Sequence, residues 1–331
     1  MRNWLRKKPA PPAVVAEVPQ SATGAHHAEQ VLRLLEWKVI RRLDGLLQGD
    51  YRTLLRGTGL DLADLREYQL HDDVRHIDWN VTARMGTPHV RVFTEDREMS
   101  AWFLLDLSPS VDFGSGELRK RNVSAEFVAV LARLLTRHGN RVGAMLYGAG
   151  VDTIVPTRSG RRHVLHLLHS MLDRVATAES GPTRLQDLLN SAASMIKRRS
   201  TIFVVSDFIS EPGWAKALAQ LAQRHEVVAV RVLDPLELEL PDLGLLTLRD
   251  AETGEQVVVD THDAGFRKRF ARIAAQRESE LRESLVRGNV DALELSTDAD
   301  LVDAIVRFVD MRKRRTQLSS GAMPAHLRRV A

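Results

Sequence analysis

The sequence predicts an α/β fold in which a mostly parallel sheet carries helices on both of its faces. Two observations lead to this prediction. Short apolar runs rich in β-branched and aromatic residues recur along the chain, as at residues 201–206. Segments with apolar residues at helical spacing separate these runs. Buried strands that alternate with amphipathic helices are typical of parallel sheets, which are covered on both faces.

Four regions follow from composition and patterning along the chain. Residues 1–24 are basic and then rich in proline, which predicts a disordered tail. Residues 25–98 are expected to form one helix and then a small β-rich segment. The alternation of strands and helices occupies residues 99–315 and defines the main domain. Residues 316–331 are expected to form a second basic tail.

The region before the main domain starts with apolar residues at helical spacing over residues 28–47. We expect this amphipathic helix to pack on the main domain. The stretch that follows is rich in turns and in charge. Its apolar positions predict strands on either side of a Gly86-Thr87-Pro88 turn, with Val81 before it and the alternating Val90 and Val92 after it.

The main domain is expected to contain six strands, a hairpin and six helices. The strands are predicted at residues 101–107, 141–147, 151–155, 201–206, 227–233 and 290–295. The helices are predicted at residues 124–136, 163–172, 183–197, 214–224, 266–286 and 300–314. Residues 245–259 predict a β-hairpin that turns at Thr253-Gly254.

Composition limits the class of protein. The chain has 331 residues, of which 44% are hydrophobic, so it can bury a sizeable core. It has no cysteine, which excludes disulfides, thiolate metal sites and cysteine nucleophiles. No apolar run approaches the roughly 18 residues of a membrane span, and the N-terminal apolar patch is too short for a signal peptide. These features predict a soluble, cytoplasmic protein.

The positive charge lies at the two ends of the chain. The formal net charge is +4, but residues 1–20 carry +3 and residues 311–331 carry +6, so residues 21–310 carry −5 and are mildly acidic. Basic tails can bind nucleic acid or anionic lipid. A nucleic-acid-binding protein that uses its tails is therefore one alternative. We regard it as the weaker one, because the folded part is acidic and aromatic residues make up only 5% of the chain.

Oxygen-bearing side chains follow the first strand of the main domain. Asp106, Ser108 and Ser110 are spaced two apart, so in an extended segment they point the same way. Pro109 disfavours the helical region for Ser108 and keeps the segment extended. One carboxylate and two hydroxyl groups are hard ligands that suit Mg²⁺, Mn²⁺ or Ca²⁺.

Two further residues are expected at the same edge of the sheet. Thr183 opens a predicted helix, and Asp207 directly follows the strand at residues 201–206. Each has a plain structural alternative, because Thr183 with Gln186 matches a capping box and Asp207 suits a turn. Ligands in parallel sheets bind beyond the carboxyl ends of the strands. Together with the first three residues, Thr183 and Asp207 therefore predict a metal site.

The five residues resemble a known site. Asp-x-Ser-x-Ser after a buried strand, a threonine before a helix and an aspartate after a later strand are similar to the metal-ion-dependent adhesion site of von Willebrand factor A domains. The preceding segment resembles the bacterial family called domain of unknown function 58, or DUF58. The residues that carry this second resemblance are Arg66-Glu67-Tyr68, Asp72 to Trp79, Thr82-Ala83-Arg84 and Val90 to Glu95, with His71 where that family usually has glycine.

The resemblance implies a von Willebrand factor A-like, doubly wound domain with a bound Mg²⁺ ion. Ser108 and Ser110 are expected to bind the ion directly, and Asp106 or Asp207 directly or through water. A remaining position on the ion is then free for an acidic side chain of a partner. The resemblance also implies a MoxR-type AAA+ ATPase as a partner, with this chain as an adaptor or co-chaperone that acts on client proteins.

An enzyme is the main alternative. A Mg²⁺-dependent phosphohydrolase could use Asp106 as its nucleophile, but Ser108 stands where such an enzyme typically carries a second acid. The chain has no Gly-x-x-x-x-Gly-Lys-Ser/Thr loop for ATP phosphates, so we expect no enzymatic activity. A second metal site is disfavoured by the spacing of its two histidines, which are five residues apart. Its candidate ligands are His71, Asp72, Asp73, His76 and Asp78. Asp78 and Trp79 are instead expected to anchor their segment on the main domain.

Overall fold

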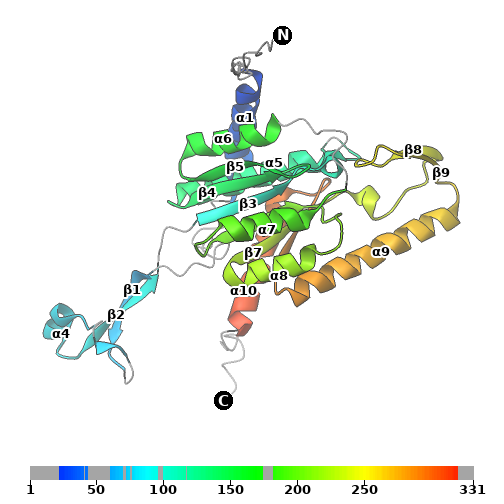
Figure 1. The fold of residues 1–331 in the computed structure, drawn as a ribbon. Coiled ribbons are helices and arrows are strands. Elements are labelled where there is room, and N and C mark those ends of the chain that lie inside the picture. Colours follow the sequence, from blue (N-terminus) through cyan, green and yellow to red (C-terminus); the bar gives the residue numbers. More distant parts are fainter. Residues whose placement is uncertain are drawn as a thin grey trace, which may run out of the picture.

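The computed structural model describes residues 22–40, 42–43, 60–69, 72–74, 77–95, 100–116, 118–173 and 182–319. Its centre is a six-stranded sheet (Figure 1). The strands are β3 (Ser100–Asp106), β4 (Arg141–Tyr147), β5 (Val151–Arg158), β6 (Thr201–Ser206), β7 (Glu226–Leu233) and β10 (Asp291–Ser296). Their order is β10-β7-β6-β3-β4-β5, and all neighbours are parallel except β4 and β5. The predicted mostly parallel sheet is confirmed.

Helices cover both faces of this sheet, as predicted. One face packs against α1 (Ala22–Leu35), α5 (Lys120–Arg137), α6 (Arg161–Leu172) and α10 (Leu301–Ser319). The other packs against α7 (Leu185–Met195), α8 (Trp214–Arg224) and α9 (Ala264–Arg287). Figure 1 shows α1 and α6 on one side of the sheet and α7 and α8 on the other. Successive residues of β3 point into different cores, because side chains alternate along a strand. Phe103 and Leu105 lie in the first core, and Leu104 lies in the second.

Helix α1 belongs to the main layer structure. Ala28, Leu32 and Leu35 are buried in the same core as α5 and α6, so the expected packing of this helix on the main domain is confirmed. A π-helical turn, η1 (Glu36–Ile40), continues it, and Glu36 accepts a hydrogen bond from Arg133 of α5 at 2.6 Å. The helix starts inside the predicted 1–24 tail, because its apolar face is stabilised by burial.

The segment before the sheet contains one element that the sequence did not predict. Strands β1 (Leu60–Glu67) and β2 (His89–Glu95) pair antiparallel, but Val81 lies in a helix, α4 (Trp79–Met85), rather than a strand. Local capping explains this. The Asp78 carboxylate accepts hydrogen bonds from the amides of Asn80 and Val81, and Gly86 ends the helix at φ 74°. Two caps outweigh the strand preference of one valine.

The expected anchor at Trp79 is also wrong, because Trp79 is 69% exposed. The same segment is stabilised instead by Arg66, which donates hydrogen bonds of 2.8 and 2.7 Å to the two carboxylate oxygens of Asp72. His71 and His76, considered above as a metal site, lie outside the described residues. None of the described helices is long and apolar enough to cross a membrane.

The C-terminal half matches most of the predicted bounds. Strand β6 and helix α8 cover residues 201–206 and 214–224 as predicted, whereas α10 continues to Ser319, into the predicted tail. The predicted hairpin consists of β8 (Leu245–Arg249) and β9 (Gln256–Asp260). Two short 3-10 turns, η3 (Pro109–Asp112) and η4 (Pro235–Glu237), follow β3 and β7 at the carboxyl edge of the sheet.

Candidate metal centre

The predicted site residues gather where the strand order reverses. From β3 the chain proceeds to β4 on one side, and it later returns to β6 on the other side of β3. The loops after β3 and β6 therefore diverge, and such a switch point is where open α/β sheets bind ligands. Asp106 is the last residue of β3, and Asp207 is the first residue after β6.

Asp106 is buried behind the loop that it starts, with 2% of its surface exposed. One carboxylate oxygen accepts a hydrogen bond of 3.0 Å from the amide of Ser108, and the other accepts one of 2.7 Å from the hydroxyl of Ser206. Burial, together with the charge of Asp207, raises the pKa of Asp106 to about 6. A cation beside the carboxylates of Asp106 and Asp207 would offset both the burial and the repulsion that disfavour the ionised form of Asp106.

The two serines of the predicted motif face each other. Ser108 is extended, at φ −59° and ψ 161°, as expected for a residue before proline. The hydroxyl oxygens of Ser108 and Ser110 lie 3.1 Å apart. Two oxygens bound at right angles to one Mg²⁺ ion, each at about 2.1 Å, lie about 3.0 Å apart. The spacing of the pair therefore fits two neighbouring positions of an octahedral magnesium site.

Asp207 has a structural role as well as a place at the site. One carboxylate oxygen accepts a hydrogen bond of 3.0 Å from the amide of Ile209, which is the turn contact expected for an aspartate after a strand. The other accepts one of 2.7 Å from the ammonium group of Lys120, at the start of α5. The position of Asp207 is thus fixed from two sides.

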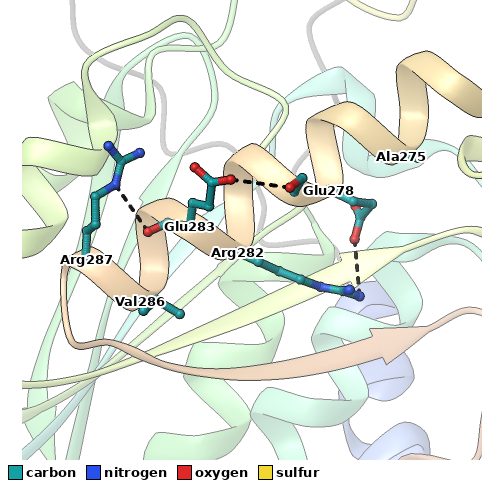
Figure 2. Close-up of a pocket in the computed structure, with 7 residues that line it drawn as sticks. Ala275, Glu278, Arg282, Glu283, Val286 and Arg287 are labelled. Atoms are coloured by element: carbon teal, nitrogen blue, oxygen red, sulfur yellow. Dashed lines mark hydrogen bonds and ion pairs between the residues drawn. The ribbon is translucent and has the colours of Figure 1, made fainter.

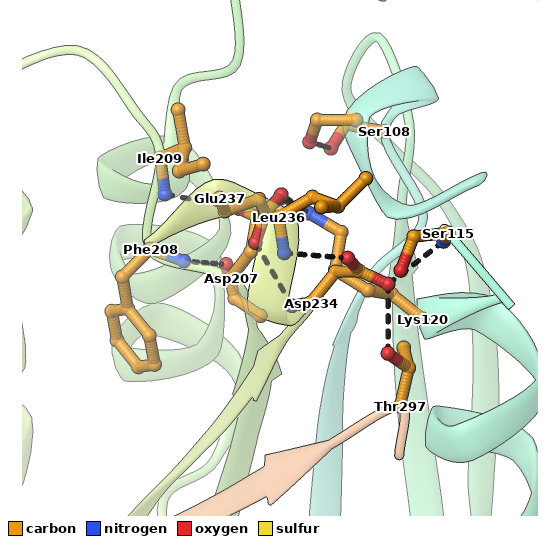
Figure 3. A network of polar contacts seen from close by, with 12 residues as sticks. Ser108, Ser115, Lys120, Asp207, Phe208, Ile209, Asp234, Leu236, Glu237 and Thr297 are labelled. Carbon is orange, nitrogen blue, oxygen red and sulfur yellow. Dashed lines mark hydrogen bonds and ion pairs between the residues drawn. The ribbon is translucent and has the colours of Figure 1, made fainter. Parts of the chain in front are cut away.

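Lys120 is a buried cation that sequence reasoning missed. Its side chain is 0% exposed, and it also contacts Glu237 of η4 at 2.5 Å (Figure 3). Burial alone would lower the pKa of Lys120, but the charges of Asp207 and Glu237 outweigh it and raise that pKa. Lys120 follows Arg119 in sequence and precedes Arg121, a pattern that indicates a solvated helix start rather than a buried charge.

A second network of hydrogen bonds connects the loops at the same edge of the sheet. The carboxylate of Asp234, which follows β7, accepts hydrogen bonds from the amide of Ser115, the hydroxyl of Thr297 and the amide of Leu236. Figure 3 shows these contacts next to Lys120 and Glu237. They join the loops after β3, β7 and β10 into one rigid edge.

Thr183 lies at this edge but does not cap α7. The residue before α7 is Arg184, whose side chain makes no capping hydrogen bond, so the capping-box alternative is wrong. The amide of Leu185, the first residue of α7, donates instead to the hydroxyl of Ser210. The hydroxyl of Thr183 instead donates a hydrogen bond of 2.5 Å to Glu252, and its carbonyl accepts one of 2.8 Å from the hydroxyl of Ser210. Ser210 is in the loop after Asp207, so Thr183 is connected to that loop.

The structure brings together three of the five predicted residues by direct contact. Asp106, Ser108 and Ser110 form one hydrogen-bonded unit, Asp207 acts on Asp106 through its charge, and Thr183 is linked to the site through Ser210. Among the described residues, no group of three or more His, Asp or Glu side chains could hold a metal ion. A site here would therefore rely on two carboxylates, hydroxyl groups and water, a donor set that fits Mg²⁺.

The comparisons with known proteins identify the family. A family model described as "Protein of unknown function DUF58" matches residues 64–280. The chain belongs to the DUF58 family. Uncharacterized proteins of Mycobacterium bovis and Mycobacterium tuberculosis are both 39% identical to it over 300 residues, which are 89% of this chain and 91% of each relative. The DUF58 resemblance stated above is thereby confirmed.

Solved structures resemble the DUF58 chain more distantly. The crystal structure of conserved hypothetical protein BatB from Bacteroides thetaiotaomicron aligns with a TM-score of 0.41 and 16% sequence identity. The alignment covers 65% of this chain and 99% of that chain.

Hollows in the DUF58 chain differ in how near they lie to the site. One, of about 570 Å³, adjoins Asp207 and Glu237 and is lined partly by apolar residues such as Phe208 and Phe270. The other, of about 660 Å³, runs along α9 (Figure 2). Arg282 and Glu278, which line it, lie 3.7 Å apart. Arg282 also pairs with Glu294 of β10, and Glu278 pairs with Arg231 of β7. Only the first hollow lies next to the predicted site residues.

Proposed function

We propose that this DUF58 protein binds a divalent cation at Asp106, Ser108 and Ser110 and uses it to hold an acidic side chain of a partner protein. Thr183 and Asp207 complete the site. Mg²⁺ is the preferred ion, and Mn²⁺ or Ca²⁺ could replace it. Residues 99–315 would then be a von Willebrand factor A-like domain with a metal-ion-dependent adhesion site.

The observation that carries this proposal is the facing pair of hydroxyl groups in front of a buried carboxylate. The hydroxyl oxygens of Ser108 and Ser110 are 3.1 Å apart, and a carboxylate oxygen of Asp106 accepts a hydrogen bond from the Ser108 amide. Charge supports the same conclusion. Asp106, Asp207 and Glu237 carry three negative charges when ionised, and Lys120 supplies one positive charge. The negative charge that remains favours a divalent cation.

The proposed partner is a MoxR-type AAA+ ATPase or one of its clients, with the chain as a cytoplasmic adaptor rather than an enzyme. The family resemblance supplies this idea. Two sequence features support it, since the chain has no ATP-binding phosphate loop and no cysteine, which suits a reducing compartment. The hollow beside Asp207 and Glu237, which is lined partly by apolar residues, would supply contacts around the partner's acidic side chain.

Calorimetric titration with Mn²⁺ and Mg²⁺ tests the metal site. We expect the wild type to bind one ion and Asp106→Asn to lose affinity by at least about a hundredfold, because a ligand is removed from a small site. Asp112→Asn is the matched control. Asp112 is in the same loop but pairs with Arg121 at 2.6 Å, outside the site. Equal affinity in the wild type and Asp106→Asn would show that the assignment is wrong.

Capture from native lysate tests the partner. The full chain is used with Mg²⁺, with EDTA and as the Asp106→Asn variant. An AAA+ protein retained only by the wild type with Mg²⁺ supports a contact through the ion. Equal retention in all three cases means that the ATPase docks elsewhere and that the metal serves a client. No AAA+ protein in any case contradicts the proposed partnership.

A further inference from the structure

The turn between β8 and β9 brings an acidic side chain of the same chain onto the candidate site. One carboxylate oxygen of Glu252 accepts a hydrogen bond of 2.5 Å from the Thr183 hydroxyl. The other accepts one of 3.1 Å from the Thr183 amide. Thr183 is only 2% exposed. Both donors that Thr183 offers at this edge are therefore taken by one carboxylate, in the manner expected for an acidic ligand.

The turn that carries Glu252 is held by hydrogen bonds of its own. A carboxylate oxygen of Asp250 accepts hydrogen bonds of 2.8 Å from the Glu252 amide and 2.9 Å from the Thr253 amide. Gly254 adopts a φ of 73°, which favours glycine, and its amide donates to the carbonyl of Asp250 at 3.0 Å. The tip therefore presents Glu252 in one direction at little entropic cost, which is typical of a specific contact rather than a chance one.

The rest of the hairpin is largely exposed to solvent. Leu245 of β8 is 73% exposed, and Val258 of β9 is 68% exposed. The base of the hairpin is anchored by Thr261, whose buried hydroxyl donates to the carbonyl of Gly244 at 2.7 Å and accepts from the amide of Leu243 at 2.9 Å. Figure 1 shows the hairpin apart from the six-stranded sheet. The hairpin is therefore anchored at its base and held at its tip by Glu252, an arrangement that suits an element able to move away from the site.

We propose that Glu252 is a built-in acidic ligand of the site and that the β8–β9 hairpin is a lid, which a partner's acidic side chain must displace. This inference rests on the proposed function, because it gives Glu252 the place of the partner's carboxylate. Two carboxylates repel each other at one small site, so the internal and external ligands exclude each other. The lid thereby limits binding to partners whose contacts compensate for the free energy that is lost when Glu252 leaves Thr183.

Proteolysis of the metal-free full chain tests the lid. Trypsin can cut after Arg249, which is exposed at the end of β8. We expect Glu252→Ala to speed this cut by about tenfold, because charge-assisted hydrogen bonds that hold the tip are lost. Glu255→Ala is the matched control, since Glu255 is in the same turn and is exposed. Equal rates for the wild type and Glu252→Ala, read from the fragment masses, would overturn the lid.

The ligand role is tested with Mn²⁺ alone as the probe. The relaxation rate of water protons reports how many exchangeable waters a bound Mn²⁺ ion keeps. We expect a higher rate per bound ion in Glu252→Ala than in the wild type and in Glu255→Ala, because a water takes the place of Glu252. The same rate in all three overturns the ligand role. If none of them binds Mn²⁺, the proposed function fails as well, and the proteolysis alone decides whether Glu252 holds the hairpin.

Discussion

The ammonium group of Lys120 lies 2.7 Å from a carboxylate oxygen of Asp207, and the two side chains are only 0% and 1% exposed. Charges that are removed from water in this way are stable only while they are partnered. The pair therefore connects the start of α5 to the end of β6, beside the proposed metal ion. It makes the stability of the sheet edge depend on charge balance at the site.

Removal of this cation is expected to be costly. Lys120→Met leaves Asp207 and Glu237 without their buried partner, and loss of one member of a buried ion pair costs roughly 3–5 kcal/mol of the free energy of unfolding. Urea unfolding with EDTA measures this change. Lys216→Met serves as the control, because Lys216 is exposed on α8 and its loss is expected to change stability by less than about 0.5 kcal/mol.

A divalent cation should partly replace the missing charge. We expect Mg²⁺ to raise the melting temperature of Lys120→Met by more than it raises that of the wild type. An equal rise in both proteins would show that the ion does not interact with Asp207 and Glu237.

Asp106→Asn is expected to remove a pH-dependent loss of stability in the metal-free protein. The pKa of Asp106 is raised to about 6, so its ionised form is disfavoured in the folded state relative to the unfolded state. Stability that is fully present below the unfolded pKa, about 3.9, is lost as the pH rises through about 6. Urea unfolding between pH 4 and pH 8 in EDTA should show this loss in the wild type only. A parallel decline in the asparagine variant would mean that another group causes it.

His163 is expected to make the free energy of unfolding depend on pH in the opposite direction. Burial lowers the pKa of His163, and its ring Nε2 donates a hydrogen bond of 2.8 Å to the carbonyl of Val142. Its contribution is therefore present above the unfolded pKa, about 6.5, and is lost as the pH falls through the lower folded value. His163→Gln keeps an amide donor but does not titrate. The free energy of unfolding should then fall less from pH 7.5 to pH 5 than in the wild type, whereas equal falls would exclude His163 as the cause.

Gly213 is expected to be essential for the loop that follows Asp207. Its φ of 118° is strained for any residue with a side chain, and an added Cβ would lie 2.2 Å from the side-chain oxygen of Gln186. We expect Gly213→Ala to reduce the free energy of unfolding by roughly 1–3 kcal/mol. Gly150→Ala is the control, because nothing lies within 4 Å of the Cβ added there. Similar melting temperatures for the two variants would contradict this role for Gly213.

Local patterns were sufficient for much of the fold. The bounds of β6 and α8 follow from one buried strand pattern and one amphipathic pattern, and both agree with the structure. The same reasoning was wrong at Val81 and Trp79, in a segment where two helix caps decided the local structure. Strand preference is a weak effect, and a capped helix outweighs it over so short a segment.

The sequence by itself determined the part of the site that is local in the chain. Spacing and Pro109 predicted the common direction of Asp106, Ser108 and Ser110, because two-residue periodicity and proline geometry act between near neighbours. Only the tertiary structure decided the partners of Asp207 and Thr183. Lys120 is 87 residues from Asp207, and Glu252 is 69 residues from Thr183. Such pairs form because strand order and hairpin placement bring distant loops to one edge of the sheet, and neither is encoded in a local pattern of residues.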